Sequence, residues 1–285
     1  IPLLRAVRDS GITLYDYELI KDSNGKRLVA FGKYAGYSGM INALNGLGDR
    51  LLTRGIRTPF VNVPLTQYYQ NLKHLKSSIQ SIGKAIKNQG VPPLIFTFVG
   101  TGNVSQGAQE IFKLLPHEWI ENVKDIKEQD LKHDRVYGLI VKPQDYLHKL
   151  GSEGLFDYSE YLEKPELYES KFHEWIAPYS SVIINGIYWE SKFPRLLTKA
   201  QMKEIQANRE SRLLSIADIS CDLEGSIEFM NKASTIDDPF YYYDAINDAY
   251  STVDSDGYGS VQIMSIDNLP SQLPEDSSVH FGNQL

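Results

Sequence analysis

Hydrophobic positions along the chain follow two patterns, short continuous apolar runs and longer stretches with helical spacing. The runs are typical of strands buried on both faces of a parallel sheet, and they lie at 94–99, 134–141, 180–189, 213–221 and near the end of 254–267. Helical spacing occurs before and between them, at 32–55, 65–90 and 108–115. Strands that alternate with helices in this way predict an α/β fold built on a doubly wound parallel sheet.

Other segments extend this pattern. Residues 2–9 predict the end of an amphipathic helix, and 12–17 and 28–31 predict short strands joined by a polar turn containing Asn-Gly, a strong hairpin signal. Residues 151–177 are aromatic and acidic, which predicts a helical insertion with a solvated face. The chain begins and ends inside such elements, so we expect it to be a piece of a longer protein.

Glycines are frequent in the helix predicted at 32–55. Gly36, Gly39, Gly46 and Gly48 would each weaken an isolated helix. We therefore expect this helix to pack closely against other backbone.

A glycine-rich turn follows the run at 94–99. Gly100 permits a tight turn, and Gly102 lets backbone approach a pyrophosphate at the N-terminus of the next helix. Ser105 stands where the usual pattern has its third glycine, and Gly107 is expected to take over close helix–strand packing. With a strand before it and a helix after it, the turn predicts a dinucleotide site of the Rossmann type.

The choice between NAD and NADP stays open at this point. An acid about 20 residues after the turn binds the ribose hydroxyls in NAD sites, and Glu121 stands near that place. Lys124 and Lys127 follow closely, and a base there suits a 2′-phosphate.

Composition and charge narrow the class of protein. The 285 residues suffice for one large or two medium domains, and the net charge of −7 argues against a nucleic-acid groove. No apolar run approaches the length of a membrane span. A single cysteine, Cys221, excludes an internal disulfide and favours a reducing compartment. Asp254, Asp256 and Gly257 resemble part of a calcium loop, but its acidic ending is absent, so we expect a plain turn and no metal site.

Five stretches together resemble one family. They are "LYDYELIKDSNGKRLVAFGKYAGYSGM", "GTGNVSQGAQEIF", "IAPYSSVIINGIYWE", "DISCDLEGSIEFM" and "SIDNLPSQLP". They are similar to the lysine–ketoglutarate reductase part of the bifunctional aminoadipic semialdehyde synthases and, more distantly, to the lysine-forming saccharopine dehydrogenases of fungi. Both belong to the alanine dehydrogenase and transhydrogenase fold group.

The resemblance implies an organisation in two domains. Residues 1–31 would end an N-terminal catalytic segment, 32–265 would form the inserted dinucleotide domain, and 266–285 would begin the return to the catalytic domain. That second α/β domain would be truncated here. The family's general acid and base, a lysine and a histidine, would precede Ile1, so we expect no catalytic residue in this chain.

The resemblance also implies an activity, the condensation of L-lysine with 2-oxoglutarate and reduction of the imine to saccharopine. NADPH is the favoured cofactor, with NADH as the alternative. We expect a mitochondrial matrix location, with the cytoplasm as the alternative, a downstream saccharopine dehydrogenase domain, and a homo-oligomer as an open option. The rival hypothesis is a non-catalytic dinucleotide-binding module with a sensing or assembly role.

Site residues follow from the resemblance position by position. The substrate-binding positions are Phe31, Ser220, Cys221 and Asp222. The cofactor-binding positions are Lys26, Arg27, Gly100, Gly102, Asn103, Tyr188, Ile219, Ile266, Asp267, Asn268 and Leu269. Without the resemblance, the position of Asp222 favours a cap for a helix over "LEGSIEFM", and Cys221 favours a small polar packing role over that of a nucleophile. The fungal enzymes carry an aspartate for NAD after their second strand, which has no clear counterpart here.

Overall fold

The computed structural model describes residues 2–127, 130–151, 156–254 and 259–285. Its centre is an eight-stranded sheet with the strand order β2-β3-β1-β6-β7-β10-β8-β9. The strands are β1 (Ile95–Val99), β2 (His117–Ile120), β3 (Val136–Val141), β6 (Val182–Asn185), β7 (Ser215–Asp218), β8 (Phe240–Asp244), β9 (Ala249–Ser251) and β10 (Val261–Met264). The first six in spatial order run parallel, β8 pairs antiparallel with β10, and β9 pairs antiparallel with β8. The predicted α/β class with a mostly parallel sheet is confirmed.

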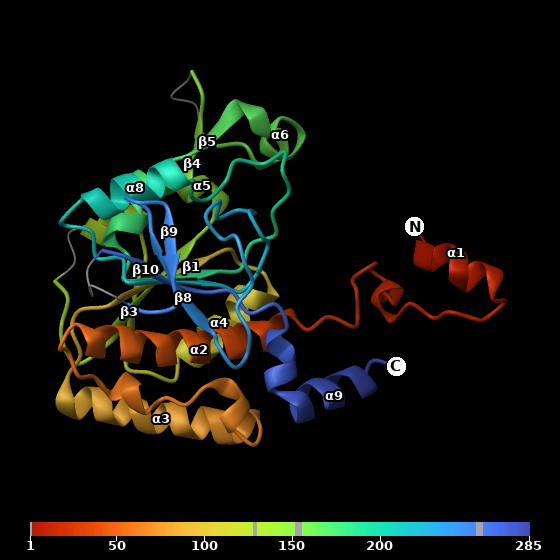
Figure 1. Cartoon of the computed structure of the whole chain (residues 1–285), viewed down its shortest axis with the longest axis horizontal. Coiled ribbons are helices and arrows are strands. Elements are labelled where there is room, and N and C mark those ends of the chain that lie inside the picture. The colour runs from red at the N-terminus through yellow and green to blue at the C-terminus, as the bar shows by residue number, and fades with distance from the viewer. Residues whose placement is uncertain (1, 128–129, 152–155, 255–258) are drawn as a thin grey trace.

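Helices cover both faces of this sheet (Figure 1). On one face lie α2 (Gly32–Thr53), α3 (Leu72–Gln89) and α4 (Asn103–Phe112). The other face is covered by α5 (Pro143–Tyr146), α7 (Phe172–Trp175) and α8 (Lys199–Ala207). Two buried clusters, one on each face, make up the core, which gives the three-layer arrangement of a doubly wound domain.

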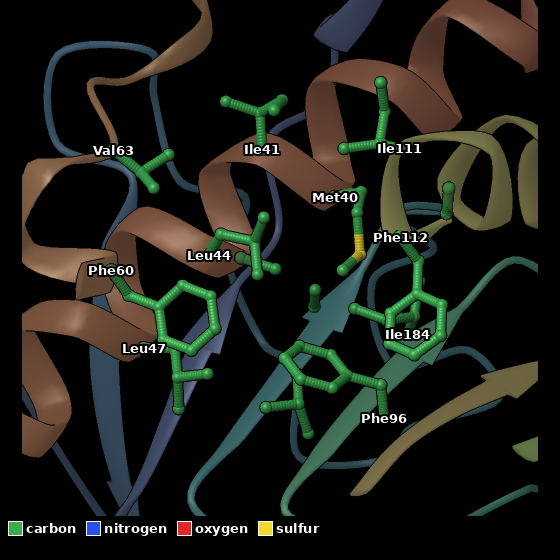
Figure 2. Close-up of a cluster of buried hydrophobic side chains, with 14 of the residues drawn as sticks. Met40, Ile41, Leu44, Leu47, Phe60, Val63, Phe96, Ile111, Phe112 and Ile184 are labelled. Atoms are coloured by element: carbon green, nitrogen blue, oxygen red, sulfur yellow. The ribbon is translucent and has the colours of Figure 1, made fainter. Parts of the chain in front are cut away.

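Helix α2 runs against the sheet and supplies much of the first cluster (Figure 2). Met40, Ile41, Leu44 and Leu47 are inaccessible to solvent. They lie beside Phe96 of β1 and the phenylalanine and isoleucine side chains of neighbouring elements. Burial of this stripe explains why a helix with several glycines is stable.

The glycines of α2 allow a close contact with α4. A Cβ at Gly36 would lie 2.1 Å from the carbonyl oxygen of Val104, and one at Gly107 would lie 2.2 Å from that of Lys33. Gly107 therefore serves helix–helix packing, and the prediction of helix–strand packing at this position is wrong. The expected close approach to other backbone is confirmed at Gly36, and at Gly48, which faces the backbone of Phe60.

The N-terminal segment leaves the body of the molecule (Figure 1). It contains α1 (Pro2–Asp9) and a hairpin turn closed by an isolated bridge between Lys21 and Arg27. The strands predicted at 12–17 and 28–31 do not form. Leu14 and Tyr15 are 62% and 86% exposed, so within the described chain this segment has no sheet on which to bury a strand.

Four further segments differ from the sequence prediction. In the described part of 151–177, the predicted helical insertion consists of short pieces, α6 (Tyr158–Glu163), β5 (Tyr168–Ser170) and α7, with β5 paired to β4 (Leu147–Lys149). The helix predicted at 65–90 begins later, at Leu72, because the Asn71 side chain caps it by accepting the His74 N–H. The edge strand β2 and the β8–β9 hairpin have short or amphipathic patterns that were not predicted as strands.

The chain ends in α9 (Pro274–Gly282), which lies beside the N-terminal segment. Tyr17 packs edge-on against Phe281, with 5.2 Å between ring centroids. The segment before α9 packs into the central domain, since Ile266, Leu269 and Leu273 belong to the buried cluster on the α2 face. The domain boundaries at 31/32 and 265/266 stay a prediction. Within the described residues, no helix is long and apolar enough to cross a membrane.

Candidate functional site

The carboxyl ends of the parallel strands bring most of the predicted site residues to one edge of the sheet. Val99 is in register with Asn185, and Asn185 with Asp218. Predicted site residues follow β1 at 100–103, β6 at 188, β7 at 219–222 and β10 at 266–269. Because ligands of open α/β sheets bind outside the carboxyl ends of the strands, this edge is the candidate site.

The turn after β1, at 100–103, has the backbone geometry that the predicted phosphate site requires, and we call it the phosphate turn. Gly100 has φ +94, a conformation that favours glycine. A Cβ at Gly102 would meet no atom within 4 Å, so open space faces this position. The first hydrogen bond of α4 runs from the Gln106 N–H to the Gly102 carbonyl, 3.0 Å. The N–H groups that precede it, beginning at Asn103, therefore have no acceptor within the helix, and with the open space at Gly102 this helix start fits a dinucleotide pyrophosphate.

A cavity of about 710 Å³ lies next to this turn. The turn contributes Gly100 and Gly102, the end of β3 contributes Lys142, and the loop after β6 contributes Tyr188 and Lys192. Tyr188 is 80% exposed, and its hydroxyl donates to Glu190, 2.9 Å. The volume is in the range of small-molecule and cofactor sites.

A buried polar cluster joins β6 to β7 at the same edge. The Asn185 amide donates to a carboxylate oxygen of Asp218 and to the hydroxyl of Ser226, both 3.0 Å. That same oxygen of Asp218 accepts the hydroxyl and backbone N–H of Ser220. Asp218 is 1% exposed, and burial raises the pKa of its carboxyl to about 6.

Sequence reasoning missed Asn185 and Asp218. Their signal is a polar residue that ends an otherwise apolar strand, in "VIIN" and "SIAD". The second carboxylate oxygen of Asp218 and the amide oxygen of Asn185 have no partner among the described residues. The cluster holds the start of the loop at 219–222, since the Ile219 N–H also donates to the Asn185 carbonyl, 2.9 Å.

The loop after β7 carries the predicted substrate residues. Cys221 has φ +54, and its thiol donates to the carbonyl of Ser265, 3.0 Å, which ties this loop to the end of β10. Burial raises the pKa of the Cys221 thiol to about 12, so the group stays a protonated donor and a packing role is favoured over a nucleophile. Burial also raises the pKa of Asp222, which is partly exposed.

The helix-cap alternative for Asp222 is wrong. Residues 223–230 form turns and a bridge, so no helix directly follows Asp222. The nearest helix before it, α8, is capped by Thr198. Gly225 N–H donates to the Asp222 carbonyl, 2.9 Å, in a tight turn. The Asp222 carboxylate is therefore not used as a helix cap.

The remaining predicted positions lie after β10, directly before α2 and in the N-terminal hairpin. After β10, Ile266 and Leu269 are buried at 2% and 1% exposure, while the two residues between them, Asp267 and Asn268, are exposed.

Phe31 directly precedes α2, and its ring packs against His280 and Phe281 of α9, with 5.9 and 6.3 Å between ring centroids. The next residue, Gly32, faces the phosphate turn, since a Cβ there would lie 3.3 Å from the Cβ of Asn103.

Lys26 and Arg27 lie elsewhere, in the exposed N-terminal hairpin. Lys26 N–H donates to Asp22, 2.8 Å, and Arg27 pairs with Glu18, 3.4 Å. Within the described chain these contacts are to the hairpin itself, so a cofactor role for both residues stays a prediction.

The candidate acid Glu121 lies on the wrong strand for a ribose contact. It follows β2, which is the edge of the sheet, whereas the neighbour of β1 is β3. Two strand spacings, about 10 Å, separate β2 from β1. The sequence rule of about 20 residues fails here because the edge strand is inserted in the chain before the strand that neighbours β1.

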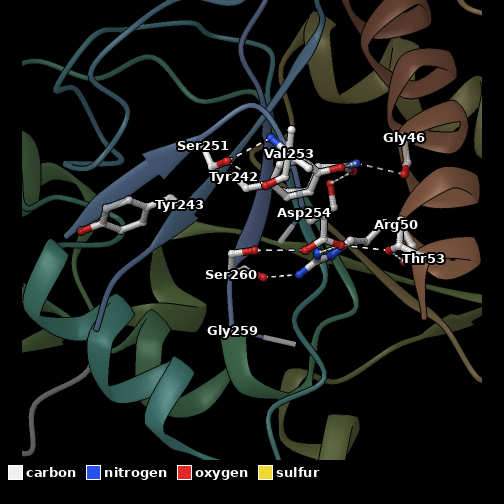
Figure 3. A network of polar contacts seen from close by, with 12 residues as sticks. Gly46, Arg50, Thr53, Tyr242, Tyr243, Ser251, Val253, Asp254, Gly259 and Ser260 are labelled. Atoms are coloured by element: carbon white, nitrogen blue, oxygen red, sulfur yellow. Dashed lines mark hydrogen bonds and ion pairs between the residues drawn. The ribbon is translucent and has the colours of Figure 1, made fainter. Parts of the chain in front are cut away.

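The turn predicted at 254–257 is partly described. Asp256 and Gly257 lie outside the described residues. Asp254 forms a buried ion pair with Arg50, which also donates to the carbonyl of Ser260 and lies 5.3 Å from the ring centroid of Tyr242 (Figure 3). Asp254 thereby links α2 to the segment before β10, which is a structural role.

Comparison with known proteins identifies relatives over the whole chain. No family model matches. The chain is 42% identical to the alpha-aminoadipic semialdehyde synthase of Arabidopsis thaliana, over 100% of the chain and 28% of that protein. It is 40% identical to the mitochondrial alpha-aminoadipic semialdehyde synthase of Bos taurus, over 99% of the chain and 32% of that protein.

A more distant relative is the saccharopine dehydrogenase [NAD(+), L-lysine-forming] of Candida glabrata, 27% identical over 99% of the chain and 62% of that protein. The chain thus spans less than a third of the length of the plant synthase and about a third of the bovine one. The resemblance inferred from the motifs is confirmed: the chain is related, from end to end, to one segment of the alpha-aminoadipic semialdehyde synthases and more distantly to the lysine-forming saccharopine dehydrogenases.

Proposed function

We propose that this chain is the cofactor-binding part of an oxidoreductase that condenses L-lysine with 2-oxoglutarate and reduces the imine to saccharopine, with NADPH as the reductant. The observation that carries the proposal is the carboxyl edge of the sheet. There an open glycine turn leads into α4 beside a large cavity. The names of the relatives supply the reaction class.

The residues present fit a nicotinamide dinucleotide. Gly100, Gly102 and the N–H groups at the start of α4 would hold the pyrophosphate. Tyr188 and Ile219 would border the two halves of the cofactor, as would the segment at 266–269. When bound, the dinucleotide supplies a hydride to the imine carbon.

Substrate recognition would use the loop after β7. A carboxylate at Asp222 suits the ammonium of an amino acid, and the hydroxyl of Ser220 is fixed by Asp218. Phe31, directly before α2, would supply an apolar contact to the carbon chain of the substrate. These roles rest on the resemblance and on the position of each residue at this edge.

The wider setting follows from the relatives. In a longer protein, further segments would complete the catalytic domain and add a saccharopine dehydrogenase domain. The mammalian relatives carry the word mitochondrial in their names, so we propose a mitochondrial location. The rival, a binding module without catalysis, predicts cofactor binding with no turnover even when the chain is part of the longer protein.

The phosphate turn is tested by Gly102→Val. The new side chain has room in the free chain but would occupy the space assigned to the pyrophosphate. We expect the affinity for NADPH, measured by titration calorimetry, to fall at least about tenfold, or 1.4 kcal/mol.

The matched control is Gly282→Val in α9, another glycine that faces open space. It should leave the affinity unchanged. Equal affinity of the Gly102→Val variant and the wild-type chain would refute the proposed phosphate site.

A further inference from the structure

The residue that would contact the 2′ position of the adenosine ribose can be located from the strand order of the sheet. In dinucleotide folds this position follows the strand that neighbours β1 on the adenosine side. Here that strand is β3, whose last residue, Val141, pairs with Val99. The Gly100 N–H donates to the Val141 carbonyl, 2.9 Å, so the residue after Val141 lies directly beside the phosphate turn. That residue is Lys142.

The surroundings of Lys142 leave its ammonium available. Lys142 is exposed and lines the same cavity as Gly100 and Gly102. Its backbone N–H donates to the carboxylate of Asp145, 2.7 Å, so this nearby acid caps the start of α5. Lys192, on the other side of the cavity, pairs with Glu190, 3.4 Å. Among the described residues that line this cavity, Lys142 is the cation for which no ion pair is seen.

We propose that Lys142 recognises the 2′-phosphate of NADPH and so sets the cofactor preference of this site. The inference rests on the proposed function, because it assumes that a nicotinamide dinucleotide binds here. A lysine ammonium forms a charge-assisted hydrogen bond with a phosphate dianion, whereas the 2′-hydroxyl of NADH gains little from it. An acid at this position would do the reverse, favouring the hydroxyl and repelling the phosphate.

Two other lysines are the rival candidates. Lys124 and Lys127 follow the edge strand β2 and line a separate cavity of about 450 Å³, together with Trp175. Gln144 borders both cavities. The ammonium of Lys127 lies 4.9 Å from the ring centroid of Tyr179. If the 2′-phosphate reached this second cavity, these lysines and not Lys142 would carry the preference.

The test compares dissociation constants for NADPH and NADH, measured by titration calorimetry on the 285-residue chain. The variants are Lys142→Ala, Lys142→Arg, Lys142→Asp, Lys192→Ala and the double variant Lys124→Ala/Lys127→Ala. We expect Lys142→Ala to weaken NADPH roughly 10- to 100-fold and NADH less than about threefold. Arginine should retain the preference, and aspartate should reverse it toward NADH. Adenosine 2′-monophosphate should bind the wild-type chain and lose its affinity in Lys142→Ala.

The outcomes distinguish a failure of the role proposed for Lys142 from a failure of the proposed function. NADH binding serves as the folding control for every variant, since it should persist in all of them. If the wild-type chain binds neither dinucleotide, the proposed function fails and this inference with it. If it binds both, but Lys142→Ala weakens them equally or not at all, or the Lys124/Lys127 variant alone loses NADPH, the role of Lys142 is overturned while the proposed function stands.

Discussion

At the scale of single residues, the ionisation of Asp218 is expected to make the free energy of unfolding depend on pH. Burial raises the pKa of its carboxyl from 3.8 to about 6. The folded chain therefore binds more protons than the unfolded chain between these values, and the free energy of unfolding falls as the pH rises through that window. Two pKa units correspond to at most about 3 kcal/mol. We expect Asp218→Asn to remove this part of the pH dependence, because the amide does not ionise.

Urea unfolding of both proteins at pH values below and above that window measures the effect. Wild type should lose about 1 to 3 kcal/mol more than the variant between the two ends. Parallel pH profiles would contradict the raised pKa of Asp218.

Residue by residue, the site was predictable where glycine or a long motif marks it. Gly100 and Gly102 fall at the expected turn, because their backbone freedom is a local property. Lys142 could not be found by counting residues from this turn, since the edge strand β2 comes between β1 and β3 in the chain. Asp218 was missed because its partners, Asn185 and Ser226, come together only in the folded sheet.

At the scale of elements, the contact between α2 and α4 fixes the position of the phosphate turn. Gly36 and Gly107 let the two backbones meet, and α4 begins at Asn103 directly after the turn. A valine at Gly107 would place its Cβ 2.2 Å from the Lys33 carbonyl, so the helices must separate. We expect Gly107→Val to lower the free energy of unfolding by about 3 kcal/mol, at the upper end of overpacking effects.

Chemical denaturation of Gly107→Val beside Gly102→Val checks this point. The second variant faces open space in the same part of the chain, so its stability should stay within about 0.5 kcal/mol of wild type. Equal stability of the two variants would show that α2 and α4 do not pack through these glycines.

The elements themselves were predictable to different degrees. The parallel strands β1, β3, β6, β7 and β10 follow from apolar runs, because both of their faces are largely buried. The helices α2, α3 and α4 follow from helical spacing, because each buries an apolar stripe against the core. The strands expected at 12–17 and 28–31 fail for the opposite reason. Their pattern is strand-like, but within the described chain they have no neighbour to pair with, and a lone hairpin is marginal in water.

At the scale of the whole molecule, the candidate site is a single edge of one sheet. Most of the proposed cofactor positions lie there, whereas the N-terminal segment, to which Lys26 and Arg27 belong, leaves the body of the molecule together with α1 (Figure 1). The exposed apolar residues of that segment, such as Leu3 and Tyr15, suit packing against further protein. This arrangement agrees with the proposal that the chain supplies the cofactor side of a larger catalytic unit.

The last prediction follows from that proposal. The resemblance assigns the proton-transfer lysine and histidine to positions before Ile1, so the 285-residue chain should bind NADPH but consume it negligibly with L-lysine and 2-oxoglutarate. Loss of general acid–base assistance costs about 10²- to 10⁴-fold in rate, and the loss of substrate positioning costs more. NADPH absorbance is followed with both substrates present, and calorimetry on the same sample establishes that cofactor is bound. A turnover near about 10 s⁻¹, typical of enzymes, would place the proton-transfer groups within these residues and overturn the division of labour proposed here.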